Sequence, residues 1–117
     1  MTPDDLKKRT KQFGLRVIQL VESLPKTQTA AVIGKQLLHC ATSVGANYRA
    51  ACRGRSKPDF IAKLGIAEEE ADESIYWLEM LVEAKIVKSE LVAELLAEAD
   101  ELTAIIASSR ITAKKSK

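Results

Sequence analysis

The chain has 117 residues, of which 46% are apolar and 29% are charged, and its net charge is +2. This size and composition are typical of one soluble globular domain that is long enough to bury a single core. No apolar run is long enough to cross a bilayer, and residues 1–5 lack the basic and apolar regions of a secretory signal. We therefore expect a cytoplasmic protein with no membrane partner.

The first predicted helix starts at Thr2 and stops before Pro25. Thr2 and Asp5 have the spacing of a capping box, and Pro3 suits the first helical position. The helix ends because a proline disfavours helical geometry in the residue before it. Apolar residues recur at spacings of three and four along this segment. Those expected to face the core are Leu6, Phe13, Val17, Leu20, Val21 and Leu24.

The second predicted helix follows a cap at Thr27 or Thr29 and ends near Gly54, which we expect to adopt the left-handed conformation. Its predicted core stripe consists of Ile33, Leu37, Cys40, Ala41, Val44, Tyr48 and Ala51. The small residues beside this stripe are Ala30, Gly34, Gly45 and Ala46. Because glycine costs a helix up to about 1 kcal/mol relative to alanine, we expect close packing of a neighbouring helix here. We also predict that this small-residue side takes part in self-assembly.

The third predicted helix spans residues 57–83 after a cap at Ser56. Its predicted core stripe consists of Phe60, Ile61, Leu64, Ala67, Ala71, Ile75, Leu78 and Val82. A second face beside this stripe carries more apolar area than a solvated face needs, which favours contact with another chain. The residues predicted at this oligomer interface are Ile66, Glu70, Glu73, Trp77 and Leu81.

The fourth predicted helix starts at a Ser89 cap and carries an apolar repeat of heptad type. Its predicted core residues are Leu91, Leu95, Ala99, Leu102 and Ile106, flanked by Val92, Leu96 and Ile105. Four amphipathic helices with short loops predict an all-α fold, an antiparallel up-down-up-down four-helix bundle. We place the domain at residues 1–110 and expect residues 111–117 to form a basic, flexible tail.

No catalytic or metal-binding pattern is present, so we predict a protein that is not an enzyme and has no cofactor. The acidic residues of the third helix, among them Glu70 and Glu73, lack the Glu-x-x-His pairs of a di-metal bundle site. The sole histidine, His39, precedes Cys40. We do not expect these two to bind one metal ion, because neighbouring helical residues point about 100° apart. Cys40 and Cys52 are separated by about 18 Å along one helix, beyond disulfide reach.

The basic segment between the second and third helices is the strongest candidate site. Residues 44–66 hold five basic and one acidic side chain, whereas residues 67–101 hold twelve acidic and two basic ones. The candidates for binding a nucleic-acid backbone are Arg49, Arg53, Arg55, Lys57 and Lys63. The alternative is an ordinary basic helix end, whose cations complement the helix dipole, in a self-assembling structural protein that binds no nucleic acid.

The stretch from residue 36 to residue 81 resembles one protein family. The shared elements, in order, are Gln36-Leu37-Leu38, Ala41 to Asn47, Arg55-Ser56-Lys57, Asp59-Phe60-Ile61, Lys63-Leu64, Ile66-Ala67, Glu70-Ala71 and Tyr76-Trp77-Leu78. They resemble the four-helix-bundle proteins encoded by intervening sequences in bacterial 23S rRNA genes. This group includes the accessory variability protein of diversity-generating retroelements. The family commonly has an acidic, glycine-containing turn after the asparagine, where this chain has the basic stretch 48–53.

The resemblance implies an antiparallel bundle over the whole chain and, in several members, a ring-shaped homopentamer. For the retroelement members it implies binding of a reverse transcriptase and of nucleic acid, and for most members it implies no established activity. We therefore expect a homo-oligomer whose partners are RNA or DNA and a protein such as a reverse transcriptase.

Overall fold

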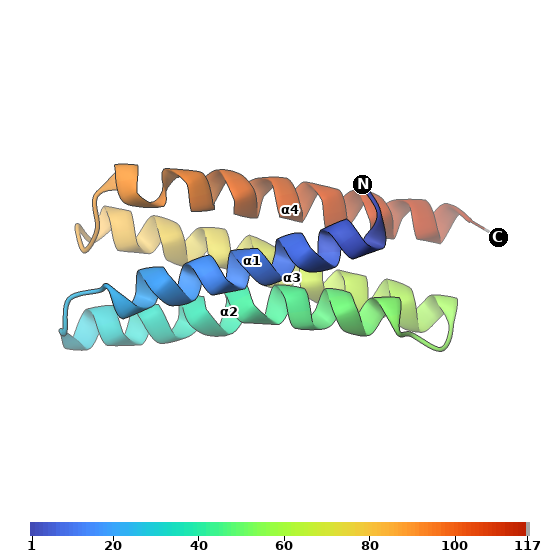
Figure 1. Ribbon diagram of the computed structural model, residues 1–117, viewed down its shortest axis with the longest axis horizontal. Coiled ribbons are helices and arrows are strands. Elements are labelled where there is room, and N and C mark those ends of the chain that lie inside the picture. Colours follow the sequence, from blue (N-terminus) through green and yellow to red (C-terminus); the bar gives the residue numbers. More distant parts are fainter. Residues whose placement is uncertain (117) are drawn as a thin grey trace.

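Four antiparallel helices make up the structure, a computed structural model that describes residues 1–116 (Figure 1). They are α1 (Pro3–Glu22), α2 (Gln28–Cys52), α3 (Lys57–Glu83) and α4 (Ser89–Lys115). The bundle measures 50 × 21 × 19 Å. The predicted all-α four-helix bundle is confirmed. No helix within residues 1–116 combines the length and the apolar character needed to cross a membrane.

Side-chain caps start the first three helices. The Thr2 hydroxyl accepts from the Asp5 N–H at 3.1 Å, and the Thr2 N–H donates to the Asp5 carboxylate at 3.0 Å, which confirms the capping box. Thr27 caps α2 and Ser56 caps α3, each by accepting a backbone N–H. These caps fix three of the four helix starts where the sequence predicts them.

The start of α4 differs from the prediction. Lys88 occupies the cap position and makes no side-chain hydrogen bond to the helix. The Ser89 hydroxyl donates instead to the Glu90 carboxylate at 2.8 Å, so the predicted Ser89 cap is wrong. The first turn of α4 therefore leaves its backbone N–H groups without a side-chain acceptor.

The core stripe predicted for α2 is confirmed, since all seven of its residues are buried. In α1, four of the six predicted residues are buried. The other two are half-buried, Val21 in the last turn of the helix and Leu24 just beyond its end. Thr10 also lies in the α1 core face. Its hydroxyl donates to the Leu6 carbonyl at 2.9 Å, which satisfies a polar group that has no access to water.

The buried faces of α3 and α4 alternate steps of three and four residues. In α3 the buried residues are Leu64, Ala67, Ala71, Ser74, Leu78 and Leu81. In α4 they are Val92, Leu95, Ala99, Leu102 and Ile106. Phe60 continues this register toward the start of α3 and is half-buried. The predicted core residues Ile61, Ile75 and Val82 lie outside it and are also half-buried. Leu91 is also outside it and is 59% exposed, so its predicted place in the core is wrong.

The small-residue side of α2 packs against α1 of the same chain. A Cβ at Gly34 would lie 3.1 Å from Leu24 Cδ1, and one at Gly45 would lie 3.4 Å from backbone atoms of Thr10. The predicted close approach of a helix is therefore confirmed. The neighbouring helix at Gly34 and Gly45 belongs to the same chain, whereas Ala46 stays exposed. The participation of this side in self-assembly stays a prediction.

α2 ends without a left-handed glycine. No glycine in residues 1–116 has a positive φ, so the predicted left-handed conformation of Gly54 is wrong. The Gly54 N–H instead bonds to the Ala51 carbonyl at 2.9 Å. A Cβ at Gly54 would lie 2.9 Å from Asp59 Oδ2 and 3.0 Å from the Ala51 oxygen. This position needs glycine for space and not for its conformational freedom.

The predicted tail, residues 111–117, is helical for most of its length. α4 continues to Lys115, so the predicted domain boundary at residue 110 lies inside a helix. The last residue of the predicted tail, Lys117, lies outside the described residues. The end of α4 lies at the same end of the bundle as the start of α1 and the α2–α3 loop (Figure 1).

Candidate nucleic-acid interface

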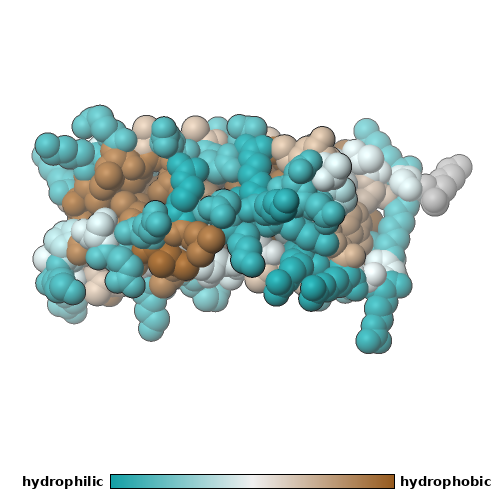
Figure 2. Space-filling model, in the orientation of Figure 1, coloured by the Kyte–Doolittle hydropathy of each residue, from teal (hydrophilic) through white to brown (hydrophobic). Residues whose placement is uncertain are grey.

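Three segments that are distant in the sequence meet at one end of the bundle. The antiparallel topology places the start of α1 beside the end of α2, and the start of α3 follows across the α2–α3 loop (Figure 1). On the face shown in Figure 2, hydrophilic side chains cover the middle and extend toward this end, whereas apolar side chains gather toward the opposite end. The fold therefore adds a third segment to the two that the sequence predicts.

Most of the predicted basic residues surround one shallow hollow at this end. The hollow has a volume of about 500 Å³, and its charged lining residues are Arg49, Arg53, Arg55, Asp59 and Lys63. Lys57 is exposed at the first position of α3 but does not line the hollow. The structure thus brings four of the five predicted residues together.

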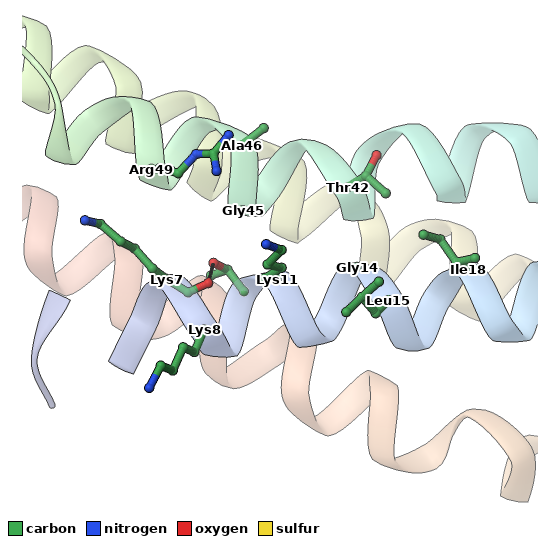
Figure 3. Close-up of a pocket in the computed structure, with 11 residues that line it drawn as sticks. Lys7, Lys8, Lys11, Gly14, Leu15, Ile18, Thr42, Gly45, Ala46 and Arg49 are labelled. Atoms are coloured by element: carbon green, nitrogen blue, oxygen red, sulfur yellow. Dashed lines mark hydrogen bonds between the residues drawn. The ribbon is translucent and has the colours of Figure 1, made fainter. Parts of the chain in front are cut away.

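A groove between α1 and α2 adjoins this hollow (Figure 3). Its volume is about 440 Å³, and its basic lining residues are Lys7, Lys8, Lys11 and Arg49. Ala46 and Arg49 line both the groove and the hollow, so the two openings lie side by side. In Figure 3, Lys7 and Lys11 extend toward α2, and Lys8 points away from it. The exposed side chains of Leu15 and Ile18 supply an apolar stretch farther along the groove.

The three lysines of α1 were not predicted from the sequence, because they are separated from Arg49 by almost the length of two helices. The signal that could have found them is the i, i+4 spacing of Lys7 and Lys11, combined with the antiparallel pairing of α1 and α2. We call the whole set the basic surface. It consists of Lys7, Lys8, Lys11, Arg49, Arg53, Arg55, Lys57 and Lys63.

Few carboxylates neutralise the basic surface. Lys7 lies 3.7 Å from Asp4, and Lys63 lies 3.7 Å from Asp59. Within residues 1–116, the other six cations of the surface have no carboxylate within 4 Å. Two paired carboxylates against eight cations leave a net positive charge on the basic surface.

The two most perturbed weak acids of the chain are neutral and poorly suited to catalysis. Burial raises the pKa of the Cys40 thiol well above its ordinary value, and the Glu73 carboxylate that accepts its hydrogen bond at 2.8 Å raises it further. Burial and the neighbouring Cys52 likewise raise the pKa of Tyr48. A nucleophilic cysteine needs the opposite shift, toward the thiolate, so neither group is activated.

The residues predicted at the oligomer interface lie in different environments. Ile66 is 41% exposed, and half-buried Trp77 makes an edge-on contact with Tyr76, with 4.9 Å between ring centroids. Leu81 is fully buried, so its predicted place at an interface is wrong. The physical reason is the alternation of three- and four-residue steps in α3, which turns Leu81 into the core of its own chain.

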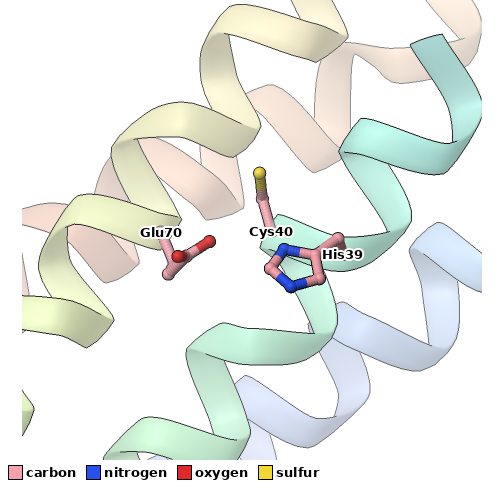
Figure 4. A group of neighbouring side chains, drawn as sticks. All are labelled: His39, Cys40 and Glu70. Atoms are coloured by element: carbon pink, nitrogen blue, oxygen red, sulfur yellow. The ribbon is translucent and has the colours of Figure 1, made fainter. Parts of the chain in front are cut away.

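The two acidic residues predicted at that interface lie near α2. Glu73 Oε2 is 2.8 Å from Cys40 Sγ. Glu70 extends from α3 toward His39 and Cys40 (Figure 4). One ligand atom of each of these three residues lies within 4.8 Å of the other two. His39 and Cys40 thus place their donor atoms closer together than the angle of about 100° between neighbouring helical residues indicates.

Comparison with known proteins places this fold in a family. The family described as 23S rRNA-intervening sequence protein matches residues 5–108 of the chain. A similar crystal structure is that of a protein with unknown function from the S23 ribosomal protein family of Bacteroides thetaiotaomicron. It is 34% identical in sequence, with a TM-score of 0.87, and the match covers 94% of this chain and 98% of that chain. The chain has no match among curated proteins. Since the family match spans most of the sequence and a relative shares the four-helix fold, this chain belongs to the 23S rRNA-intervening sequence protein family.

Proposed function

We propose that this protein is a non-enzymatic, oligomeric adaptor that binds the phosphate backbone of RNA or DNA through the basic surface. One observation carries the proposal. Eight cations from three segments of the chain gather at one end of the bundle, and six of them have no carboxylate within 4 Å in the described residues. A polyanion is the partner that this arrangement fits best.

The expected driving force is the release of counterions from the nucleic acid. Each phosphate that a lysine or arginine neutralises lowers the slope of log K against log[salt] by about 0.9 for duplex DNA and about 0.7 for single strands. The α1–α2 groove and the adjoining hollow are both open, so a backbone can reach several cations at once. Binding should therefore weaken steeply as the salt concentration rises.

The same surface is poorly equipped to distinguish base sequences. Aromatic residues make up 4% of the chain, and no aromatic side chain from the described residues lines the groove or the hollow. Base stacking on aromatic rings is the usual means of holding single strands, and contacts with base edges are the usual means of reading sequence. We therefore propose contacts with the backbone and little sequence preference.

The proposed oligomer forms through the outer face of α3. Ile66 and Tyr76 are 41% and 52% exposed, and the Nε1–H of Trp77 is buried without an acceptor in residues 1–116. Exposed apolar side chains of this kind favour contact with another chain. A ring of five copies, as the family resemblance implies, would repeat the basic surface five times. A protein partner such as a reverse transcriptase belongs to the same proposal.

The proposal is tested by filter binding of a structured RNA and of a duplex DNA over a series of salt concentrations. We expect the triple variant Arg49→Glu, Arg53→Glu and Arg55→Glu to abolish binding to both. A matched control is Lys26→Glu, Lys35→Glu and Lys88→Glu, which changes the net charge equally at exposed positions toward the other end of the bundle. This control should retain most of the wild-type affinity.

Two outcomes would overturn the proposal. If wild-type protein binds neither nucleic acid at low salt, the chain is better described as a self-assembling structural module. If both triple variants lose affinity equally, binding follows net charge and not the basic surface. The assembly is tested separately by light scattering, where a monomer mass of 12.8 kDa would exclude the ring.

A further inference from the structure

A cluster of metal-ligating side chains lies between α2 and α3, outside the basic surface (Figure 4). We propose that His39, Cys40 and Glu70 bind a divalent transition-metal ion of the zinc type, with Glu73 beside them as the hydrogen-bond acceptor of Cys40. The Cys40 thiol releases its proton to solvent as the metal–sulfur bond forms. His39 and Cys40 are consecutive residues of α2. Glu70 and Glu73 are three residues apart on α3, a spacing that places them on one face of the helix.

The donor atoms are close enough to share one ion. One ligand atom each from His39, Cys40 and Glu70 lies within 4.8 Å of the other two, and Glu73 Oε2 is 2.8 Å from Cys40 Sγ. Zinc bonds to sulfur at about 2.3 Å and to nitrogen or oxygen at about 2.0–2.2 Å, which places tetrahedral ligands about 3.5 Å apart. Binding of an ion would therefore draw these donor atoms closer together than they lie in its absence.

One carboxylate oxygen at this position has no partner. Glu70 Oε2 is buried and makes no hydrogen bond within residues 1–116. Buried polar atoms are nearly always satisfied, and one that is not calls for an explanation such as an ion. A cation held between Glu70 and Cys40 would supply the missing interaction, because both groups would face its charge.

The types of ligand select the class of metal. A cysteine sulfur and a histidine nitrogen favour zinc, cobalt or a similar ion over magnesium and calcium, which prefer oxygen ligands. The site is also accessible. His39 is exposed, and an open hollow of about 410 Å³ adjoins the cluster, with charged lining residues Glu69, Glu70, Asp72 and Glu73. These carboxylates attract cations to the entrance.

Cobalt(II) is a suitable probe because it takes zinc sites and reports their ligands in its absorption spectrum. The purified full chain, stripped of metal with a chelator, is titrated with Co²⁺ and then with Zn²⁺. We expect a sulfur-to-cobalt charge-transfer band in the near ultraviolet and visible bands of tetrahedral intensity. One equivalent of Zn²⁺ per chain should remove both, because zinc competes for the same ligands.

Three single variants assign the site. Cys40→Ser should remove the charge-transfer band, and His39→Ala should weaken Co²⁺ affinity at least tenfold. Because His39 is exposed, its variant should fold even if a change at buried Cys40 does not. The matched control is Cys52→Ser, at the other cysteine of α2, which should retain the wild-type spectrum. Thermal melting by circular dichroism checks that each variant is folded.

The results separate this inference from the proposed function. Absence of Co²⁺ binding by wild-type protein would overturn the metal site, as would loss of the band in Cys52→Ser and not in Cys40→Ser. Unchanged affinity in His39→Ala would also overturn it. Since the metal ligands and the basic surface share no residue, each result leaves the nucleic-acid test unaffected.

Discussion

Arg9 on α1 and Arg49 on α2 differ in whether their guanidinium group pairs with a carboxylate of the same chain. Arg9 faces α4, where its guanidinium donates to the two carboxylate oxygens of Glu98 at 2.7 and 2.8 Å and lies 2.7 Å from Glu101. Arg49 lies on the α1–α2 groove and has no carboxylate within 4 Å among the described residues. Arg9 therefore joins two helices of its own chain, and Arg49 remains available to a partner.

The acidic residues of the neighbouring helix decide which role a cation takes. α4 presents Glu98 and Glu101 three residues apart, on the face that Arg9 meets. α2 contains no acidic residue at all, so cations along the α1–α2 groove find no carboxylate across it. Lys8 and Arg9 are neighbours in the sequence but point about 100° apart on the helix. A run of basic residues can thus contain cations that pair within the chain and cations that are free to bind a partner.

The largest expected effect of this difference is on stability. Arg9→Met should lower the free energy of unfolding by about 2 kcal/mol, because it removes a bidentate, charge-assisted pair and leaves a partly buried carboxylate without its partner. Arg49→Met should change it by less than about 0.5 kcal/mol, as an exposed substitution usually does. Urea denaturation followed by circular dichroism measures both.

Of the two carboxylates that pair with Arg9, Glu98 should contribute more to stability. Its side chain is 17% exposed, and that of Glu101 is 61% exposed. Glu98→Gln should therefore destabilise the protein more than Glu101→Gln does. Equal losses for Arg9→Met and Arg49→Met would contradict the division into structural and available cations.

A smaller effect is expected where α4 meets α3. Arg110 Nε donates to Glu68 Oε1 at 2.7 Å, and this hydrogen bond, together with the charge of Glu68, raises the pKa of Arg110. Arg110→Met should leave global stability nearly unchanged, because the pair lies near the end of α4, but it should speed amide hydrogen exchange in the last turns of that helix. Lys114→Met is the control, since Lys114 has no carboxylate within 4 Å in the described residues. Equal exchange in the two variants would contradict an anchoring role for Arg110.

Features that depend on nearby residues could be predicted from the sequence. The bounds of α3 were predicted at residues 57 and 83 and lie there, because the Ser56 cap and the loss of the apolar pattern are local signals. The capping box at Thr2 was likewise predicted, and the cap of α2 is Thr27, one of the two positions that the sequence left open. The four-helix fold follows from the same signals, since each helix carries one apolar stripe.

Features that depend on distant residues could not be predicted. The partner of Arg9 is almost ninety residues away, and no local pattern indicates which carboxylate it meets. Leu81 was wrongly assigned to the oligomer interface, and its neighbour Val82 to the core. The two residues lie on adjacent stripes of α3 that are equally apolar in the sequence, and Leu81 is the buried one. The proximity of His39 to Glu70 depends on how far α2 and α3 are shifted along their axes relative to each other, which only the packed structure defines.

The smallest expected effect separates two adjacent carboxylates at the start of α1. The Asp5 carboxylate accepts the Thr2 N–H at 3.0 Å, whereas Asp4 lies 3.7 Å from Lys7 with its side chain 87% exposed. Hydrogen bonds from Thr2 lower the pKa of Asp5 below its ordinary value of 3.8. Asp5→Ala should therefore lower the melting temperature at pH 7 more than Asp4→Ala does, because both variants lose a charge beside the helix dipole but only one loses the capping box.

The pH dependence of the Asp5 effect has a definite sign. A carboxylate whose pKa is lowered by folding stabilises the protein above the pKa of the unfolded chain, and this contribution is lost as the pH falls through the lower folded value. The difference in melting temperature between wild type and Asp5→Ala should therefore be constant above about pH 5 and shrink toward zero in strong acid. A difference that persists at the lowest pH would show that Asp5 acts through the helical propensity of its side chain and not through its charge.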